Sequence, residues 1–139
     1  MSDQLAIEAI NEMVTEQFPG TRNRCIELGD DYAVAAYDVT DDDIRPGGFV
    51  SGPCQFALAD CGLWFLSFVG LGRIEPMALT SELSIRFLRP AVGTRIVCRA
   101  DLEAVSRRSV VGTAHVWVEG APDKITAAAQ GTYAIPLPR

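Results

Sequence analysis

Histidine and lysine are almost absent from this chain, which has one of each, His115 and Lys124, among 139 residues. The 4 cysteines include no CxxC pair, and zinc sites are built mainly from closely spaced cysteines and histidines. A zinc site is therefore not expected. Acidic residues outnumber basic residues by 18 to 12, which gives a net charge of -6. Because nucleic acids are bound through clustered positive charge, a nucleic-acid partner is not expected either.

Segments that would direct the chain to a membrane are not expected either. Residues 1–13 carry acidic side chains and no long apolar core, unlike a signal peptide. The apolar run 56–71 is short for a bilayer and contains Asp60. The sequence has no repeats, low-complexity stretches or interdomain linkers. We expect a single domain over residues 1–139, in a cytoplasmic protein that has reduced cysteines and no membrane partner.

Hydrophobic periodicity predicts two helices and six strands. Apolar residues at helical spacing indicate a first helix that is capped by Ser2 and ends at Pro19-Gly20. A second helix begins near Pro53 and is apolar on all sides over 56–69, so other elements must cover it. Alternating apolar residues predict strands at 25–28, 32–39, 79–87, 95–102, 110–118 and 125–135. Short connections favour antiparallel neighbours, and the result is an α+β layer arrangement.

A loop and a lone carboxylate lie between the predicted second strand and the centre of the apolar helix. Residues 40–52 contain three consecutive aspartates followed by Pro-Gly-Gly, which is typical of a loop. Beyond that loop, Asp60 is the only charged side chain as far as Gly72. An isolated aspartate in a helix is most simply a structural carboxylate held by hydrogen bonds. Where other catalytic groups lie beside it, the same carboxylate can act as a general base or a nucleophile.

Two stretches, SGPCQFALAD and TSELSIRFLRPAVG, resemble motifs of the hotdog-fold acyl-CoA thioesterases, in the PaaI-like branch of the 4-hydroxybenzoyl-CoA thioesterase superfamily. SGPCQFALAD at 51–60 is similar to the family's HGGxxxxLAD, and TSELSIRFLRPAVG at 80–93 is similar to its strand and turn ending in (Y/F)LxPAxxG. Either motif alone is weak, but the pair at this separation is specific. The resemblance runs from about 44 to 134. It implies the hotdog fold, a long central helix wrapped by a curved antiparallel sheet, here with an additional N-terminal helix.

The first motif departs from the common family pattern at three positions. Ser51 stands where the family's histidine usually stands, Pro53 replaces the second glycine, and Arg45 stands where many relatives have an asparagine. Gly52 matches the first glycine, and Asp60 falls on the family's catalytic carboxylate. A subset of PaaI-like proteins has a similar RPGGxxSGP form in place of the histidine form. The departures are therefore consistent with the resemblance.

The resemblance implies hydrolysis of acyl-CoA thioesters to a carboxylic acid and free CoA. Asp60 would act as general base for water or as a nucleophile, and the backbone N–H of Gly52 at the helix start would donate to the oxyanion. Thr80, from the facing subunit of the family's dimers, would orient the water. No metal or separate cofactor is implied, because CoA enters as part of the substrate.

Five further residues are candidates for substrate binding: Arg45, Ser51, Gln55, Arg107 and Arg108. Gln55 lies on the first turn of the second helix. Arg107 and Arg108 occupy a predicted hairpin turn, where relatives often carry a basic residue that meets CoA phosphates. Simpler interpretations exist, since arginines in loops are commonly solvated and Ser51 suits a helix cap. His115 is expected to have a packing or interface role.

Two other functions stay open beside hydrolysis. A hotdog protein with these departures could bind acyl-CoA without hydrolysing it, although the presence of Asp60 argues against this. A hotdog dehydratase needs a histidine paired with a carboxylate, and His115 is far from the motif. Because a hotdog monomer would leave a sheet edge unpaired, we expect a homodimer with a continuous sheet, which can double to a homotetramer.

Overall fold

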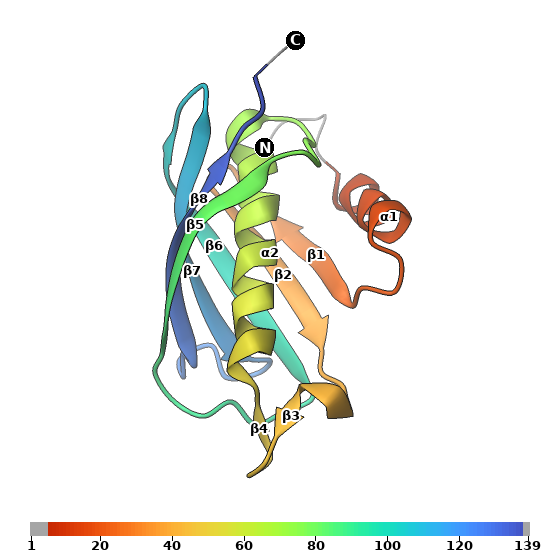
Figure 1. Ribbon diagram of the computed structural model, residues 1–139, viewed down its shortest axis with the longest axis vertical. Helices are drawn as coiled ribbons and strands as arrows, with labels where there is room; N and C mark the ends of the chain where they lie inside the picture. The colour runs from red at the N-terminus through yellow and green to blue at the C-terminus, as the bar shows by residue number, and fades with distance from the viewer. Residues whose placement is uncertain (1–5, 138–139) are drawn as a thin grey trace.

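The computed structural model describes residues 6–137 and shows one long helix enclosed by a curved antiparallel sheet (Figure 1). The helices are α1, Ile7–Gln17, and α2, Gly52–Leu71. The main strands are β1, Asn23–Leu28; β2, Tyr32–Asp38; β5, Leu79–Phe87; β6, Arg95–Val105; β7, Ser109–Val118; and β8, Ala127–Ala134. A short 3-10 helix, Asp41–Asp43, and the strands β3, Ile44–Arg45, and β4, Phe49–Val50, connect β2 to α2.

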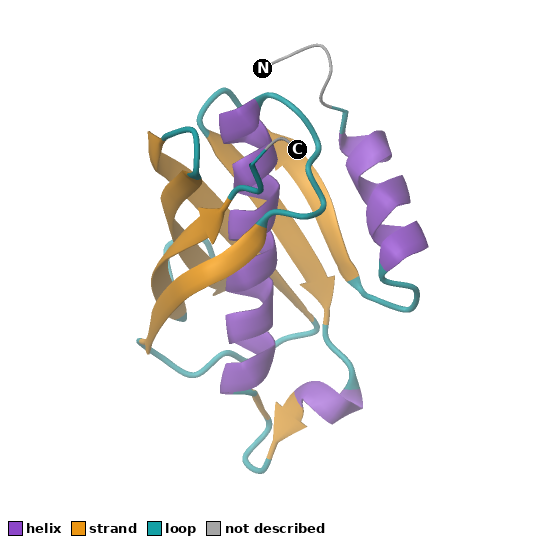
Figure 2. Cartoon of the chain, turned by 45° about the horizontal axis from the view of Figure 1, so that its top comes forward, coloured by secondary structure: helices purple, strands orange, loops and turns teal. Residues whose placement is uncertain are grey.

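The sheet has the strand order β1-β2-β6-β7-β8-β5, with every neighbouring pair antiparallel. Figure 2 shows α2 within the curve of this sheet and α1 beside β1. The strands β1 and β5 are the two edges of the sheet, so β5, which follows α2 in the chain, pairs only with β8. This arrangement is the α+β architecture that the sequence predicts.

The two ends of α2 are fixed by local chemistry. The Ser51 hydroxyl accepts a hydrogen bond from the Cys54 N–H at 3.2 Å, so Ser51 is the helix cap. Pro53 follows in the first turn, where a missing N–H costs no intrahelical bond. The helix stops at Gly72, whose φ of 74° is left-handed and favours glycine. The start of α2 thus lies within one residue of the predicted position.

With 20 residues, α2 is long and apolar enough to cross a membrane by length and composition alone. It exceeds the length suggested by the apolar run 56–71, because the capped first turn adds residues. However, 56% of its most apolar window is buried within the chain, as in the core helix of a packed layer. Length and composition are therefore weak evidence for a membrane span. The buried side chains on α2 include Leu58, Leu63, Phe65, Leu66 and Phe68.

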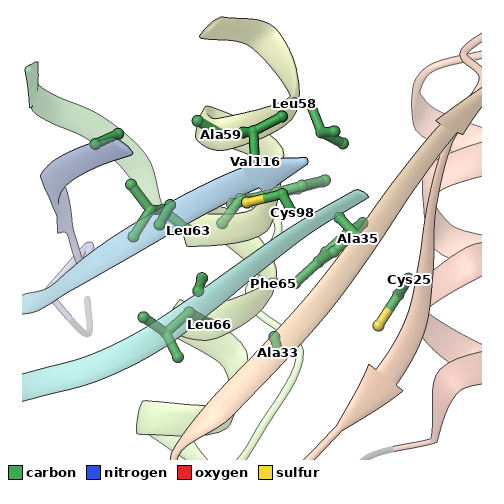
Figure 3. Packing of buried hydrophobic residues seen from close by; sticks show 14 of the residues in the cluster. Cys25, Ala33, Ala35, Leu58, Ala59, Leu63, Phe65, Leu66, Cys98 and Val116 are labelled. Atoms are coloured by element: carbon green, nitrogen blue, oxygen red, sulfur yellow. The ribbon is translucent and has the colours of Figure 1, made fainter. Parts of the chain in front are cut away.

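The helix α2 and the strand β6 approach each other closely at Gly62. A Cβ atom on Gly62 of α2 would lie 2.7 Å from the Cys98 Sγ on β6, which is too close for packing. Gly62 therefore sets the distance between the helix and the strand. Figure 3 shows buried side chains of α2, among them Leu63, Phe65 and Leu66, packed against strands that carry Ala33, Cys98 and Val116. All four cysteines are free thiols.

The structure corrects several predicted boundaries. The first helix is described from Ile7, with Ala6 at its N-cap position, and the predicted cap Ser2 lies outside the described residues. The predicted loop 40–52 contains the 3-10 helix and the β3–β4 pair. Two-residue strands are too short to produce an alternating pattern, so periodicity could not reveal them. In addition, β1 begins at Asn23, β6 continues to Val105, and β8 begins at Ala127.

Candidate active site

Asp60 is held by two hydroxyl groups from the sheet. It is half-buried on α2, and its Oδ1 accepts hydrogen bonds from the Tyr133 hydroxyl and the Thr80 hydroxyl, each at 2.6 Å. The Tyr133 hydroxyl also lies 3.0 Å from the backbone carbonyl oxygen of Asp60. Thr80 on β5 and Tyr133 on β8 are register partners, so the antiparallel pairing brings both hydroxyls to one point. The pairing of the two strands therefore fixes the orientation of the carboxylate.

Tyr133 stays protonated beside this carboxylate. Burial is the main cause of a pKa well above that of an ordinary tyrosine, and the hydrogen bond to Asp60 raises the pKa further. The phenol is therefore a hydrogen-bond donor to Asp60 throughout the neutral range. Sequence reasoning did not single out Tyr133 as a functional residue. The only available signal was its inward position in the alternating pattern of the predicted strand 125–135.

Thr80 is brought to Asp60 within one chain. The prediction from the resemblance placed Thr80 on a facing subunit, but its hydroxyl bonds to the carboxylate of its own chain. The reason is the topology: β5 follows α2 and runs back along it at the sheet edge, so the start of β5 meets the middle of α2. Thr80 thus orients the carboxylate directly.

A cavity of about 390 Å³ lies beside Asp60 and is mostly apolar. Its walls come from the end of α1 and the turn after it, the start of β1, α2, residues 76–80 and Tyr133 on β8. Among the lining residues are Val14, Phe18, Ala57, Cys61, Trp64, Ala78 and Leu79. Trp64 packs edge-on against Phe18, with ring centroids 5.5 Å apart, which joins α1 to the cavity wall. The carboxylate therefore faces a space suited to an apolar group.

Gly52 lies in a separate groove of about 490 Å³ at the start of α2. As the first residue of the helix, it has an N–H with no acceptor one turn earlier, at the positive end of the helix dipole. The groove brings Gly52 together with the predicted residues Arg45 and Gln55. Ser51 is not part of this lining, and its hydroxyl is used in the helix cap. The groove and the Asp60 cavity share no lining residue.

The remaining predicted residues lie elsewhere. Arg107 and Arg108 are exposed in the turn between β6 and β7, and neither lines the Asp60 cavity or the Gly52 groove. The neighbouring Val105 and Val110 approach Gly70, so this turn is near the C-terminal end of α2, opposite Gly52. His115 is half-buried in β7 and pairs in register with Arg99. Within residues 6–137, no group of three or more His, Cys, Asp and Glu side chains is placed to hold a metal ion.

Comparisons with known proteins place this geometry in a family. The family model described as the thioesterase superfamily matches residues 47–123. A candidate thioesterase from Silicibacter sp. TM1040 is similar over 99% of this chain and 94% of its own, with 32% sequence identity and a TM-score of 0.80. A search of curated protein sequences gives no match.

Two further solved structures resemble the chain. The conserved protein PA5202 from Pseudomonas aeruginosa has 25% identity and a TM-score of 0.73, with 96% of each chain covered. A variant of the phenylacetic acid degradation protein PaaI from Thermus thermophilus has 26% identity and a TM-score of 0.67, with 82% of this chain and 93% of that chain covered. Since the family match spans more than half of the sequence, the chain belongs to the thioesterase superfamily, has its hotdog fold, and falls in the class of thioester hydrolases.

Proposed function

We propose that this protein hydrolyses acyl-CoA thioesters to a carboxylic acid and free CoA, and that Asp60 activates water or attacks the thioester. The observation that carries the proposal is the Asp60 carboxylate, which Tyr133 and Thr80 hold at the wall of an apolar cavity. The apolar walls suit an acyl group, and the family supplies the thioester chemistry.

The orientation of Asp60 leaves one oxygen for the reaction. Both side-chain hydrogen bonds go to Oδ1, and no described residue donates to Oδ2. As a general base, Oδ2 takes a proton from water while the water oxygen adds to the thioester carbonyl carbon. The tetrahedral oxyanion then collapses, the C–S bond breaks, and the CoA thiolate leaves and takes up the proton. The products are the carboxylic acid and the thiol.

As a nucleophile, Oδ2 would instead add to the carbonyl carbon itself. Loss of the CoA thiolate would leave a mixed anhydride between Asp60 and the acyl group, and water would then hydrolyse it. The same two hydrogen bonds to Oδ1 would hold the carboxylate for either route. Both routes need a donor to the oxyanion, and the N–H of Gly52 is the backbone group suited to that task.

Asp60 and Gly52 of one chain lie at separate positions along α2. They are eight positions apart on α2, which is about 12 Å along a helix that rises 1.5 Å per residue. The reach of the Asp60 side chain shortens this separation, but an oxyanion donor and a carboxylate that act on one carbonyl must both lie beside it. The two residues also line separate cavities. We therefore place each reaction between the Asp60 cavity of one chain and the Gly52 groove of another.

The exposed edge of β5 provides a way to bring two such halves together. Leu79 at its start is 62% exposed and lines the Asp60 cavity, whereas Phe87 at its end is 51% exposed and lines the Gly52 groove. Antiparallel pairing of two β5 edges about a two-fold axis would set the Leu79 end of one chain beside the Phe87 end of the other. A homodimer of this kind would contain two composite sites.

Among the predicted arginines, Arg45 has the position best suited to CoA. It is exposed at the Gly52 groove, together with Arg89, and neither forms a salt bridge with a described residue. Free guanidinium groups at a helix N-terminus favour the phosphates of CoA. Arg107 and Arg108 lie near the other end of α2. Their contact with the phosphates of CoA therefore stays a prediction.

A thiol-release assay tests the proposed function. Purified protein is incubated with acyl-CoAs that carry aromatic, short and medium-length acyl groups, and free CoA is followed with a thiol reagent. The wild type should release CoA from at least one substrate, and Asp60→Asn should lower kcat by at least about a hundredfold. Asp101→Asn is the matched control, because Asp101 is paired with Arg99 on β6 outside the site, and it should retain activity.

The same panel separates hydrolysis from simple binding. Pro53 lacks an N–H and the Ser51 hydroxyl is occupied in the cap, so a protein that binds acyl-CoA without turnover is the second candidate. If the wild type binds acyl-CoAs in a calorimeter but releases no thiol, hydrolysis is excluded and the binding function stands. If Asp60→Asn stays fully active, the assignment of the site is wrong even though the enzyme function survives.

A further inference from the structure

Gln55 is a buried polar side chain one turn along α2 from Gly52. It is 4% exposed and lines the same groove as Gly52. Residues three positions apart share a helix face, and helical side chains lean towards the N-terminus. The carboxamide of Gln55 therefore lies near the Gly52 N–H, where the proposed function places the thioester carbonyl. Buried amides normally use all their hydrogen-bonding groups, so each group of the Gln55 carboxamide should have a partner.

Thr126 fixes which way this amide faces. Its hydroxyl is 2.8 Å from Gln55 Oε1 and 3.1 Å from the Val116 carbonyl, which already accepts the Thr126 N–H at 2.8 Å. The hydroxyl proton is therefore best used on Oε1. The other end of the amide lies 3.5 Å from the Val50 carbonyl oxygen, where an NH2 group is attracted and an oxygen would be repelled. Both contacts place Oε1 towards Thr126 and Nε2 towards the groove.

The NH2 group of Gln55 has donor capacity that no described residue uses. Nε2 carries two hydrogens, and its one contact, to Val50, is at the long limit for a hydrogen bond. Among the described residues, at least one N–H thus lacks a partner on a side chain that is almost fully buried, which is unfavourable unless a ligand accepts it. On the same helix, Pro53 has removed a backbone donor beside Gly52.

From these contacts, we infer that Gln55 Nε2 is the second hydrogen-bond donor to the thioester carbonyl, acting beside the Gly52 N–H, and that Thr126 is the residue that positions it. This inference rests on the proposed function and specifies its oxyanion site. As negative charge grows on the carbonyl oxygen, both donors strengthen their bonds to it, so the pair contributes more to the transition state than to substrate binding. The side-chain donor thereby makes up for the N–H that Pro53 lacks.

The test compares Gln55→Leu with Ser67→Ala in the thiol-release assay. Gln55→Leu should lower kcat about a hundredfold and leave KM within about threefold, as expected for a donor used in the transition state. Ser67 is the matched control, because it is a buried polar residue on α2 whose hydroxyl bonds to the Trp64 carbonyl away from the groove. A folded Gln55→Leu protein with kcat within threefold of the wild type would overturn the inference.

Infrared difference spectra give a readout that a structural role would not change. With a 13C-labelled acyl-CoA bound to the Asp60→Asn variant, the carbonyl stretch should lie at lower frequency than in water, because two donors polarise it. Adding Gln55→Leu should remove a large part of this shift. An unchanged shift would contradict the inference. If the wild type binds acyl-CoA but releases no thiol, hydrolysis fails while the spectrum still decides the role of Gln55; if no acyl-CoA binds, both fail.

Thr126 provides the test if Gln55→Leu does not fold. Thr126→Val keeps the shape of the side chain but loses the hydroxyl that holds Oε1, whereas Thr126→Ser keeps that hydroxyl. We expect kcat to fall about tenfold in Thr126→Val and to recover in Thr126→Ser, with the carbonyl frequency following the same order. If the two variants have equal kcat and equal carbonyl frequency, the positioning role is refuted.

Discussion

A single oxygen of Asp60 receives hydrogen bonds from both Thr80 and Tyr133, and this asymmetry matters for its chemistry. Two donors hold Oδ1 of this cavity-lining residue, whereas Oδ2 receives no side-chain hydrogen bond from a described residue. The two donors differ in setting, since Tyr133 is buried and Thr80 lies at an exposed strand edge. Tyr133 is therefore expected to contribute the stronger restraint.

Replacement of Tyr133 by phenylalanine isolates this restraint. Hydrogen bonds to charged groups are worth about 1.5 to 3 kcal/mol, so Tyr133→Phe should lower kcat by about 10- to 100-fold with little change in KM. Steady-state thiol release measures both constants. Tyr32→Phe is the control, since the Tyr32 hydroxyl donates to Glu27 on the surface and its loss should leave kcat unchanged. Equal kcat values for the two variants would show that the Tyr133 bond has no part in turnover.

Buried thiols are a feature of the packing between α2 and the sheet. Cys25 on β1 and Cys98 on β6 are fully covered, and burial raises the pKa of each from 9.0 to about 12. Cys61 on α2 is shifted in the same direction, also mainly by burial. The folded chain thus keeps these protons at a pH where the unfolded chain loses them.

The free energy of unfolding should therefore fall as the pH rises from about 9 towards 12. In this window the unfolded state binds fewer protons than the folded state, so each such thiol lowers stability by up to about 1.4 kcal/mol per pH unit. Urea unfolding between about pH 8 and pH 10.5 measures the slope. Cys98→Ala should reduce absolute stability by leaving a small cavity, but its slope with pH should be shallower. Parallel slopes for the two proteins would argue against titration of Cys98.

At the scale of the whole molecule, the proposed site has two parts, the Asp60 cavity and the Gly52 groove, which lie apart on one chain. The Asp60 cavity and the Gly52 groove lie at different places along α2, and the exposed edge of β5 runs past both. A two-fold axis at that edge would form two equivalent sites, each with a carboxylate from one chain and an oxyanion donor from the other. Sedimentation at micromolar concentration should accordingly show a dimer or a larger even assembly.

Mixing two inactive variants tests the composite site directly. Asp60→Asn removes the carboxylate, and Gly52→Pro removes the N–H at a position where proline is tolerated in a helix. After subunit exchange, about half of the dimers would be mixed and each would contain one intact site, so about a quarter of wild-type activity should return. As a control, Asp60→Asn mixed with a chain carrying both substitutions should stay inactive. Failure of the first mixture to recover activity would place the site within one chain.

The long, strongly patterned parts of this chain were predictable from sequence, and the contacts around the site were not. The strands β5 to β8 follow from extended alternation, α2 follows from a long apolar run after Pro53, and Asp60 and Gly52 follow from a motif. Tyr133 could not be found in this way, because alternation shows only that a side chain points inwards. Its contact with Asp60, 73 positions earlier, depends on the register between β5 and β8. The role of Gln55 likewise depends on Thr126, 71 positions away.

The hydrogen bonds of Asp60 also connect three elements, α2, β5 and β8, at a weak point of the sheet. Within a single chain, β5 is an edge strand with one neighbour, so it is a natural place for opening before two chains pair. The Thr80 bond fastens the first residues of β5 to the core helix. A replacement at Asp60 would therefore remove the proposed catalytic carboxylate and would also release the strand beside the Asp60 cavity.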